Sequence, residues 1–179
     1  MMSYGCKYIA LVPPCILTSD QQSVRSNGNY WGHPFVKKFR QYNMTCVSWI
    51  CPEYSFNEFQ PNLCCGKHSI HFYQALDGYN EHCEQLAEKF IQNVLDMGIV
   101  GNCSIFLFGV EYSPSCANSY IFSRKGVLKQ PGIFLNILKT KLEIQEIKTK
   151  QIGINRRYPK KALTQLTQFL EEKDPDKQP

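Results

Sequence analysis

The run from Cys103 to Tyr112 constrains the fold of this chain more than any other segment. Its residues, Cys-Ser-Ile-Phe-Leu-Phe-Gly-Val-Glu-Tyr, are apolar at both odd and even positions. Side chains along a strand alternate between the two faces of a sheet, so this run favours a central strand that is covered on both sides. With 179 residues, the chain is long enough to bury such a core without disulfides.

Elsewhere in the chain, four segments show helical periodicity. The clearest is Asn80–Met97, which Gly98 can end in a left-handed conformation. One stripe of this helix is predicted to be buried, and it contains Cys83, Ala87, Phe90, Val94 and Met97. The same reasoning predicts a short helix at 35–42, a helix that starts at Pro131 and ends near Lys139, and a last helix from Pro159.

β-branched, aromatic or alternating segments indicate strands between these helices. They are residues 7–12, 44–50, 68–76, 142–147 and 151–154, with 118–123 as a return strand that forms a hairpin with 103–112. No regular βαβ alternation is visible. We therefore expect an α+β fold with a mixed or mainly antiparallel sheet and three to four helices. The predicted single domain covers residues 1–173, and residues 174–179 form a flexible tail.

Composition and cysteine usage indicate an intracellular protein, either nuclear or cytoplasmic. Tyr8–Val12 is apolar but stops at Pro13-Pro14, which makes it too short for a signal peptide. No apolar run approaches the ~18–20 residues of a membrane helix, so we expect no membrane partner. The nine cysteines are odd in number, and several fall within helix or strand patterns. These features favour reduced, structural thiols.

The positive charge of the chain is concentrated between Arg124 and Lys161. This segment has eleven basic and two acidic residues, a net charge of 11 − 2 = +9, within a chain whose net charge is +5. The remaining residues therefore sum to −4. A segment of this charge attracts polyanions over a long range.

Within this segment, the sequence predicts a nucleic-acid-binding site with phosphate contacts and one stacking aromatic. The cations that we expect to contact phosphates are Arg124, Lys125, Lys148, Lys150, Arg156, Arg157, Lys160 and Lys161, and the stacking residue is Tyr158. The partner would be DNA or RNA. Two other interpretations stay open, namely an acidic protein surface as the partner and a solvated surface with no partner.

Two histidines and two cysteines form a weak candidate zinc site. They are Cys64, Cys65, His68 and His82, which are suitable ligand types but do not have the spacing of a common zinc motif. The simpler interpretation is a loop with buried thiols and hydrogen-bonded histidines. We therefore expect neither a bound metal nor a cofactor.

Nucleophilic catalysis has one candidate arrangement, Cys65 with His71 as base and Asp77 as orienting group. Nine cysteines and four histidines make such a combination easy to find by chance, so we expect no enzymatic activity. Four aromatic residues in predicted loops are instead candidate anchors for a protein partner, namely Tyr30, Trp31, Phe56 and Phe59. The sequence thus favours a non-enzymatic subunit or adaptor that binds nucleic acid. The alternative is an assembly factor that docks on an acidic protein.

Overall fold

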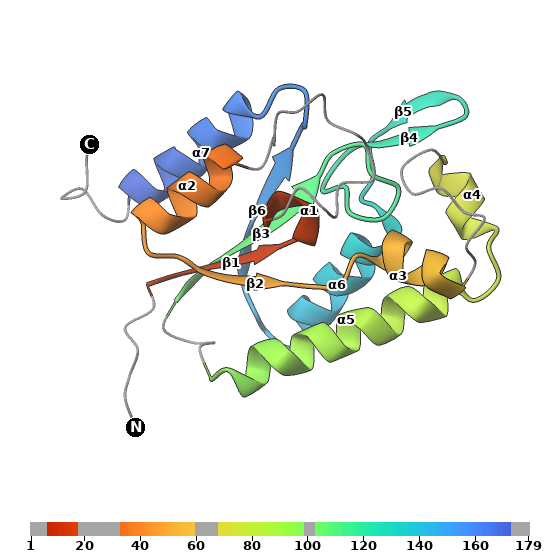
Figure 1. The fold of residues 1–179 in the computed structure, drawn as a ribbon, viewed down its shortest axis with the longest axis horizontal. Helices are drawn as coiled ribbons and strands as arrows, with labels where there is room; N and C mark the ends of the chain where they lie inside the picture. Colours follow the sequence, from red (N-terminus) through yellow and green to blue (C-terminus); the bar gives the residue numbers. More distant parts are fainter. Residues whose placement is uncertain (1–6, 18–32, 60–67, 99–102, 173–179) are drawn as a thin grey trace.

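The structure is a computed structural model that describes residues 7–17, 33–59, 68–98 and 103–172 (Figure 1). Its main sheet has four strands in the order β2-β1-β3-β6, all of them parallel to their neighbours. Their bounds are β1 Tyr8–Val12, β2 Thr45–Ser48, β3 Ser104–Val110 and β6 Thr149–Ile154. In this register Ile105 of β3 lies opposite Ile9 of β1 and Thr149 of β6.

The parallel main sheet corrects our expectation of a mixed or mainly antiparallel one. Parallel neighbours need crossover connections, and those of this chain are irregular. Three helices separate β2 from β3, and a hairpin precedes the helix between β3 and β6. These additions conceal the βαβ alternation in the sequence. The described residues also contain seven helices rather than three or four.

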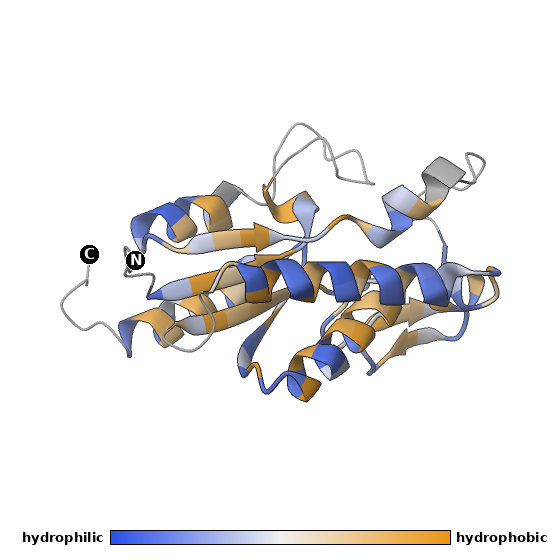
Figure 2. Cartoon of the chain, turned by 90° about the horizontal axis from the view of Figure 1, so that it is seen from below, coloured by the Kyte–Doolittle hydropathy of each residue, from blue (hydrophilic) through white to orange (hydrophobic). Residues whose placement is uncertain are grey.

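Helices cover both faces of the main sheet, which gives three layers. Helices α2 (His33–Gln41) and α7 (Lys160–Glu171) pack on one face, called here the α7 face. Helices α5 (Tyr79–Asp96) and α6 (Ile133–Ile144) pack on the other, called here the α5 face. In Figure 2 the strands are coloured mostly as hydrophobic, while α5 turns a hydrophilic side outward. The short helices are α1 Pro14–Leu17, α3 Pro52–Phe59 and α4 Ile70–Gln74.

Strand β3 occupies the central position that its composition predicts. Phe106 and Phe108 are fully buried on the α7 face, and Leu107 is fully buried on the α5 face. The ring of Phe108 meets those of Phe35 and Phe39 edge-on, at centroid distances of 6.3 and 5.2 Å. The prediction of a strand with two covered faces is confirmed.

Helix α5 also follows the sequence closely. It starts one residue before the predicted range, and Gly98 beyond its end has the expected left-handed φ of 62°. Four of the five stripe residues are buried, but Met97 is 45% exposed because the helix ends before it. The predicted strand at residues 68–76 is wrong, since helix α4 occupies most of that segment.

Helix α6 runs to Ile144, five residues beyond the predicted end at Lys139, so no strand exists at 142–147. The predicted end assumes that Lys141 cannot lie in the apolar stripe of a longer helix. In the structure Lys141 Nζ lies 2.8 Å from Glu88 Oε1 of α5, which supplies a partner for that charge. The buried stripe of α6 consists of Phe134, Leu135, Leu138 and Leu142, so Lys141 lies at its margin and does not interrupt the helix.

The predicted return strand pairs with a different segment from the one expected. Strand β4 (Ile121–Ser123) forms an antiparallel hairpin with β5 (Gly126–Leu128), not with β3. One parallel bridge, between Tyr112 and Ile121, joins this hairpin to the chain just after β3. No helix in the described ranges combines the length and the hydropathy that crossing a membrane requires.

Candidate nucleic-acid interface

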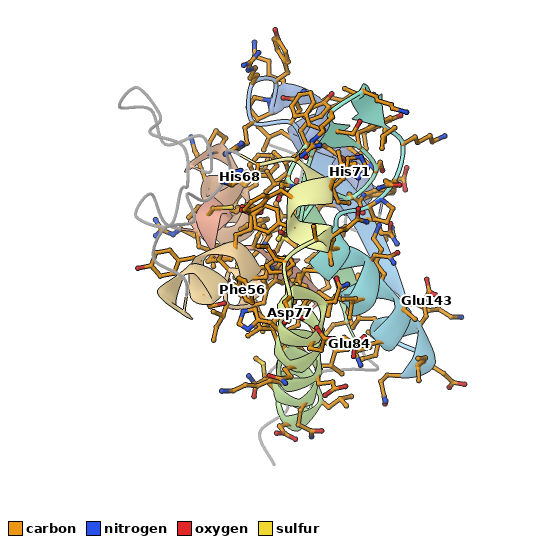
Figure 3. The ribbon with its side chains drawn as sticks, turned by 90° about the vertical axis from the view of Figure 1, so that its right-hand side faces the viewer. Phe56, His68, His71, Asp77, Glu84 and Glu143 are labelled. Carbon is orange, nitrogen blue, oxygen red and sulfur yellow. The ribbon has the colours of Figure 1, made fainter. Side chains whose placement is uncertain are left out.

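Parallel pairing brings the ends of the four strands to one edge of the main sheet, called here the carboxyl edge. The loop after β3, the hairpin β4–β5 and the turn between β6 and α7 all start at this edge. Figure 1 and Figure 3 both show the hairpin and the β6–α7 turn toward the same end of the molecule. Segments that are far apart in sequence therefore lie at one end of the molecule, where ligand sites of parallel α/β sheets are usually found.

The side chain of Glu111 joins these segments. Its Oε2 accepts hydrogen bonds from the backbone N–H groups of Ser119 and Tyr120, at 3.1 and 2.8 Å. Its Oε1 occupies the space that a side chain at Gly153 would need, and its own N–H donates to the carbonyl of Ile154. Glu111 is 9% exposed. Its contacts hold the base of the hairpin against the end of β6.

We expect Glu111→Ala to loosen the hairpin and to lower the free energy of unfolding by about 1–3 kcal/mol, because two backbone donors lose their acceptor. Hydrogen exchange should become faster at Ser119 and Tyr120, while exchange in α5 changes little. Glu143→Ala, at an exposed site on α6, is the control and should stay within about 0.5 kcal/mol. Unchanged exchange in the hairpin would contradict this role for Glu111.

Six of the eight predicted cations lie in segments that follow the carboxyl ends of β3 and β6, and we call these six residues the basic rim. They are Arg124 and Lys125 at the hairpin tip, Arg156 and Arg157 in the β6–α7 turn, and Lys160 and Lys161 at the start of α7. All are exposed except Arg156, which is half-buried. None of the six forms an ion pair within the ranges that the structure describes.

The β6–α7 turn has a defined backbone that presents Tyr158. The side chain of Asn155 accepts a hydrogen bond from the N–H of Arg157 at 2.9 Å, and its carbonyl accepts one from the N–H of Tyr158 at 3.0 Å. Asparagine favours such turns because its side chain can bond to the backbone two residues on. The Tyr158 side chain is 72% exposed, so its ring is open to a stacking partner.

The start of α7 is electrostatically unusual. Lys160 and Lys161 occupy its first turn, which contains no acidic residue. A helix N-terminus has a partial positive charge and free N–H groups, so cations there oppose the helix dipole. An anion at this position would be attracted by both the lysines and the helix.

The remaining two predicted cations lie elsewhere. Lys148 precedes β6 and is therefore at the opposite, amino edge of the sheet. Lys150 extends over the α7 face, where its Nζ lies 4.4 Å from the centroid of the Phe169 ring. We predicted that Lys148 and Lys150 would share one face of an extended segment and would support the phosphate contacts of the other cations. The structure separates both from the basic rim.

The hairpin contributes exposed aromatic residues that our sequence analysis did not select. Phe122 is 53% exposed and stacks on Tyr112 at a centroid distance of 4.7 Å, and Tyr120 is 41% exposed. Tyr112 has a φ of 70°, an uncommon value for a residue with a side chain, which turns the chain away from the sheet. Aromatic residues two positions apart beside Arg124 were a signal that could have indicated this surface.

A buried polar network underlies the carboxyl edge. Glu53, in the first turn of α3, accepts hydrogen bonds from Ser113 Oγ at 3.1 Å and from the Tyr73 hydroxyl at 3.3 Å. Tyr79 and Ser115 share a further bond of 2.6 Å between their hydroxyl oxygens. These bonds fix the loop after β3, from which the hairpin extends, and they satisfy polar groups that burial would otherwise penalise.

Thiols near this network are held in their protonated form. Burial raises the pKa of the Cys15 thiol to about 12, although nearby Arg156 acts in the opposite direction. Burial likewise raises the pKa of Cys83 to about 12 and that of Cys116 well above its ordinary value. A protonated thiol is a poor nucleophile and a poor metal ligand.

The candidate zinc ligands that can be placed make other contacts. His82 Nε2 lies 2.8 Å from Ser55 Oγ, and burial lowers the pKa of this histidine. The His68 ring stacks on Phe72 at 3.8 Å, and Cys64 and Cys65 lie outside the described residues. Within the residues that are described, no group of three or more potential ligands could hold a metal ion.

The proposed catalytic trio is not assembled by the described part of the structure. Cys65 lies outside it, while His71 and Asp77 are exposed and well apart in Figure 3. Among the aromatic anchors, Phe56 is 7% exposed and packs on Tyr79 and His82, so it belongs to the core rather than to an exposed loop. The other three anchors, Tyr30, Trp31 and the side chain of Phe59, lie outside the described residues.

Comparison with known proteins does not assign this chain to a family. No family model matches the sequence, and neither a curated protein nor a solved structure matches it.

Proposed function

We propose that this chain is a non-enzymatic subunit of a nuclear or cytoplasmic assembly and that it binds nucleic acid through the basic rim. The observation that supports this most strongly is the start of α7, where Lys160 and Lys161 adjoin Arg156, Arg157 and the free helix amides. Nucleic-acid phosphates are the anions that such an array of separate cations suits. The hairpin cations would add further phosphate contacts at the same end of the molecule.

The exposed aromatic residues favour unpaired bases over a closed duplex. Tyr158 in the turn and Phe122 in the hairpin are both more than half exposed beside rim cations. Aromatic rings stack on any base, and this gives affinity without strong sequence preference. Phosphate contacts would thus supply most of the affinity, and stacking would supply a preference for single strands.

The test is a titration of labelled single-stranded and double-stranded oligonucleotides at several salt concentrations. If all six rim cations contact phosphates, the logarithm of the single-strand association constant should fall with the logarithm of salt concentration with a slope of about −4. Tyr158→Ala should weaken single-strand binding about tenfold and leave the slope unchanged. No binding at low salt would refute the proposal.

The hairpin also favours a second candidate, an acidic protein partner. Val127 and Phe122 are each more than 50% exposed, and they lie next to Arg124 and Lys125. Apolar and cationic groups side by side suit a protein surface of opposite charge. Tight binding of labelled poly-glutamate together with weak binding of oligonucleotides at equal salt would favour this candidate over nucleic acid.

A further inference from the structure

Helices α3 and α5 bring a serine hydroxyl against a histidine ring. Ser55 Oγ of α3 lies 2.8 Å from His82 Nε2 of α5, and both side chains are half-buried. The Phe56 ring, next to Ser55, packs on His82 at a centroid distance of 5.4 Å and meets the buried Tyr79 edge-on at 5.0 Å. Packing between the two helices therefore fixes the position of the pair.

The other hydrogen bonds of this pair show where its protons lie. His82 also bonds to the backbone of Pro52, which can only accept, so the imidazole donates to the Pro52 carbonyl. Burial lowers the pKa of the His82 ring, so at neutral pH the ring is uncharged and has a single N–H. The tautomer that serves both partners with separate nitrogens has this N–H on Nδ1 and a lone pair on Nε2.

The Ser55 hydroxyl can donate to that lone pair. Its oxygen also lies 2.9 Å from the Cys51 carbonyl, one turn earlier. The Cys51 carbonyl already accepts a hydrogen bond of 3.0 Å from the Ser55 N–H, whereas Nε2 of this tautomer has no other donor among the printed contacts of the described residues. The hydroxyl proton is therefore placed to pass to His82.

A hydroxyl that bonds to a neutral, oriented imidazole is an activated nucleophile. In serine hydrolases a carboxylate orients the histidine, and here the Pro52 carbonyl occupies that role. Among the described residues, the contacts of Ser55 include no donor for the oxyanion that forms when an acyl group is attacked. The acyl groups that can react are therefore those with a good leaving group.

We propose that Ser55 is an acylation site that takes an acyl group from a thioester or an activated ester, with His82 as general base. The bond from Oγ to the acyl carbon forms, and the bond from that carbon to the leaving sulfur or oxygen breaks. The Oγ proton moves to His82 Nε2 and from there to the leaving group, which regenerates the neutral histidine.

The reaction stops at the modified serine. The product is an ordinary alkyl ester, which is a poorer electrophile than the donor, and water attacks it slowly when no oxyanion donor assists. Each chain is thus acylated once, without turnover. The inference goes beyond the proposed binding of nucleic acid and is compatible with a non-enzymatic subunit, because neither residue belongs to the basic rim.

The test is incubation of the full chain with p-nitrophenyl acetate, followed by mass spectrometry of its peptides. Ser123 is an internal control, since its half-buried hydroxyl donates to the Gly126 carbonyl and makes no printed contact with a histidine of the described residues. General-base assistance predicts that Ser55 is acetylated at least about 100-fold faster than Ser123. Equal rates at the two serines would overturn the proposal.

Variants of the base extend the test. His82→Gln should slow acetylation of Ser55 about 100-fold, whereas His71→Gln, which changes an exposed histidine of α4, should leave the rate unchanged. Native acetylation of a folded His82→Gln protein would refute the role of His82. If that variant does not fold, Ser55→Cys keeps the base, and iodoacetamide should alkylate the new thiol faster than the exposed Cys46. Slower alkylation than at Cys46 would contradict the site.

Discussion

Replacing Arg157, Lys160 and Lys161 together with Glu is expected to lower affinity for single-stranded oligonucleotides about 100-fold or more at low salt. Each change removes an attractive charge at the rim and adds a repulsive one beside the phosphates. All three residues are exposed, so the free energy of unfolding should change little. Reversal at Lys160 and Lys161 should even favour α7, since carboxylates suit the first turn of a helix.

The chain offers a matched control for this experiment. Lys37 and Arg40 on α2 and Lys89 on α5 are also exposed, and their replacement with Glu changes the net charge by the same amount. Binding that depends on local contacts should fall much less in this control than in the rim variant. Equal losses in the two variants would mean that net charge alone governs binding, and the rim would then not be a site.

Phe108→Ala is expected to have the largest effect on stability, a loss of about 3–5 kcal/mol in the free energy of unfolding. Its side chain is fully buried in the central strand, and its ring contacts two rings of α2. Removing the ring leaves a cavity that the packed rings cannot fill. Urea denaturation measures the change through the transition midpoint, provided that the slope of the transition is unchanged.

Two further variants serve as comparisons for Phe108→Ala. Phe108→Leu keeps most of the apolar volume and should cost less, roughly 1–2 kcal/mol, which keeps the test informative if the Ala variant does not fold. Tyr158→Ala removes an exposed ring and should stay within about 0.5 kcal/mol. A similar cost for Phe108→Ala and Tyr158→Ala would contradict the central position of β3.

Local patterns correctly predicted the elements whose burial is encoded in their own periodicity. They failed where contacts between distant residues determine the structure. The 103–112 run and the stripe of α5 carry their burial in their periodicity, so both were predicted correctly. The end of α6 was missed because Lys141 lies at the margin of the buried stripe and pairs with Glu88 of another helix, which no local pattern reveals. The direction of strand pairing depends on crossovers, and a hairpin and several short helices interrupt those.

For the candidate site, too, the sequence could predict local clustering but not the contacts between distant segments. Clustering in sequence identified the cations around 156–161, because a single turn places them together. It could not show that Lys148 and Lys150 would be separated from them, since a six-residue strand has two ends and two faces. Nor could it show that Glu111 would connect the start of the hairpin to the end of β6. That connection is visible only once the folded sheet brings its partners together.

The Glu111 contacts also bear on the binding proposed for this surface. Since one carboxylate holds the base of the hairpin against the end of β6, the separation of the two segments that carry the cations is constrained at their bases before any ligand arrives. A preorganised receptor loses less conformational entropy on association. Ligands whose charges match that fixed separation should therefore be preferred over equally charged ligands that do not.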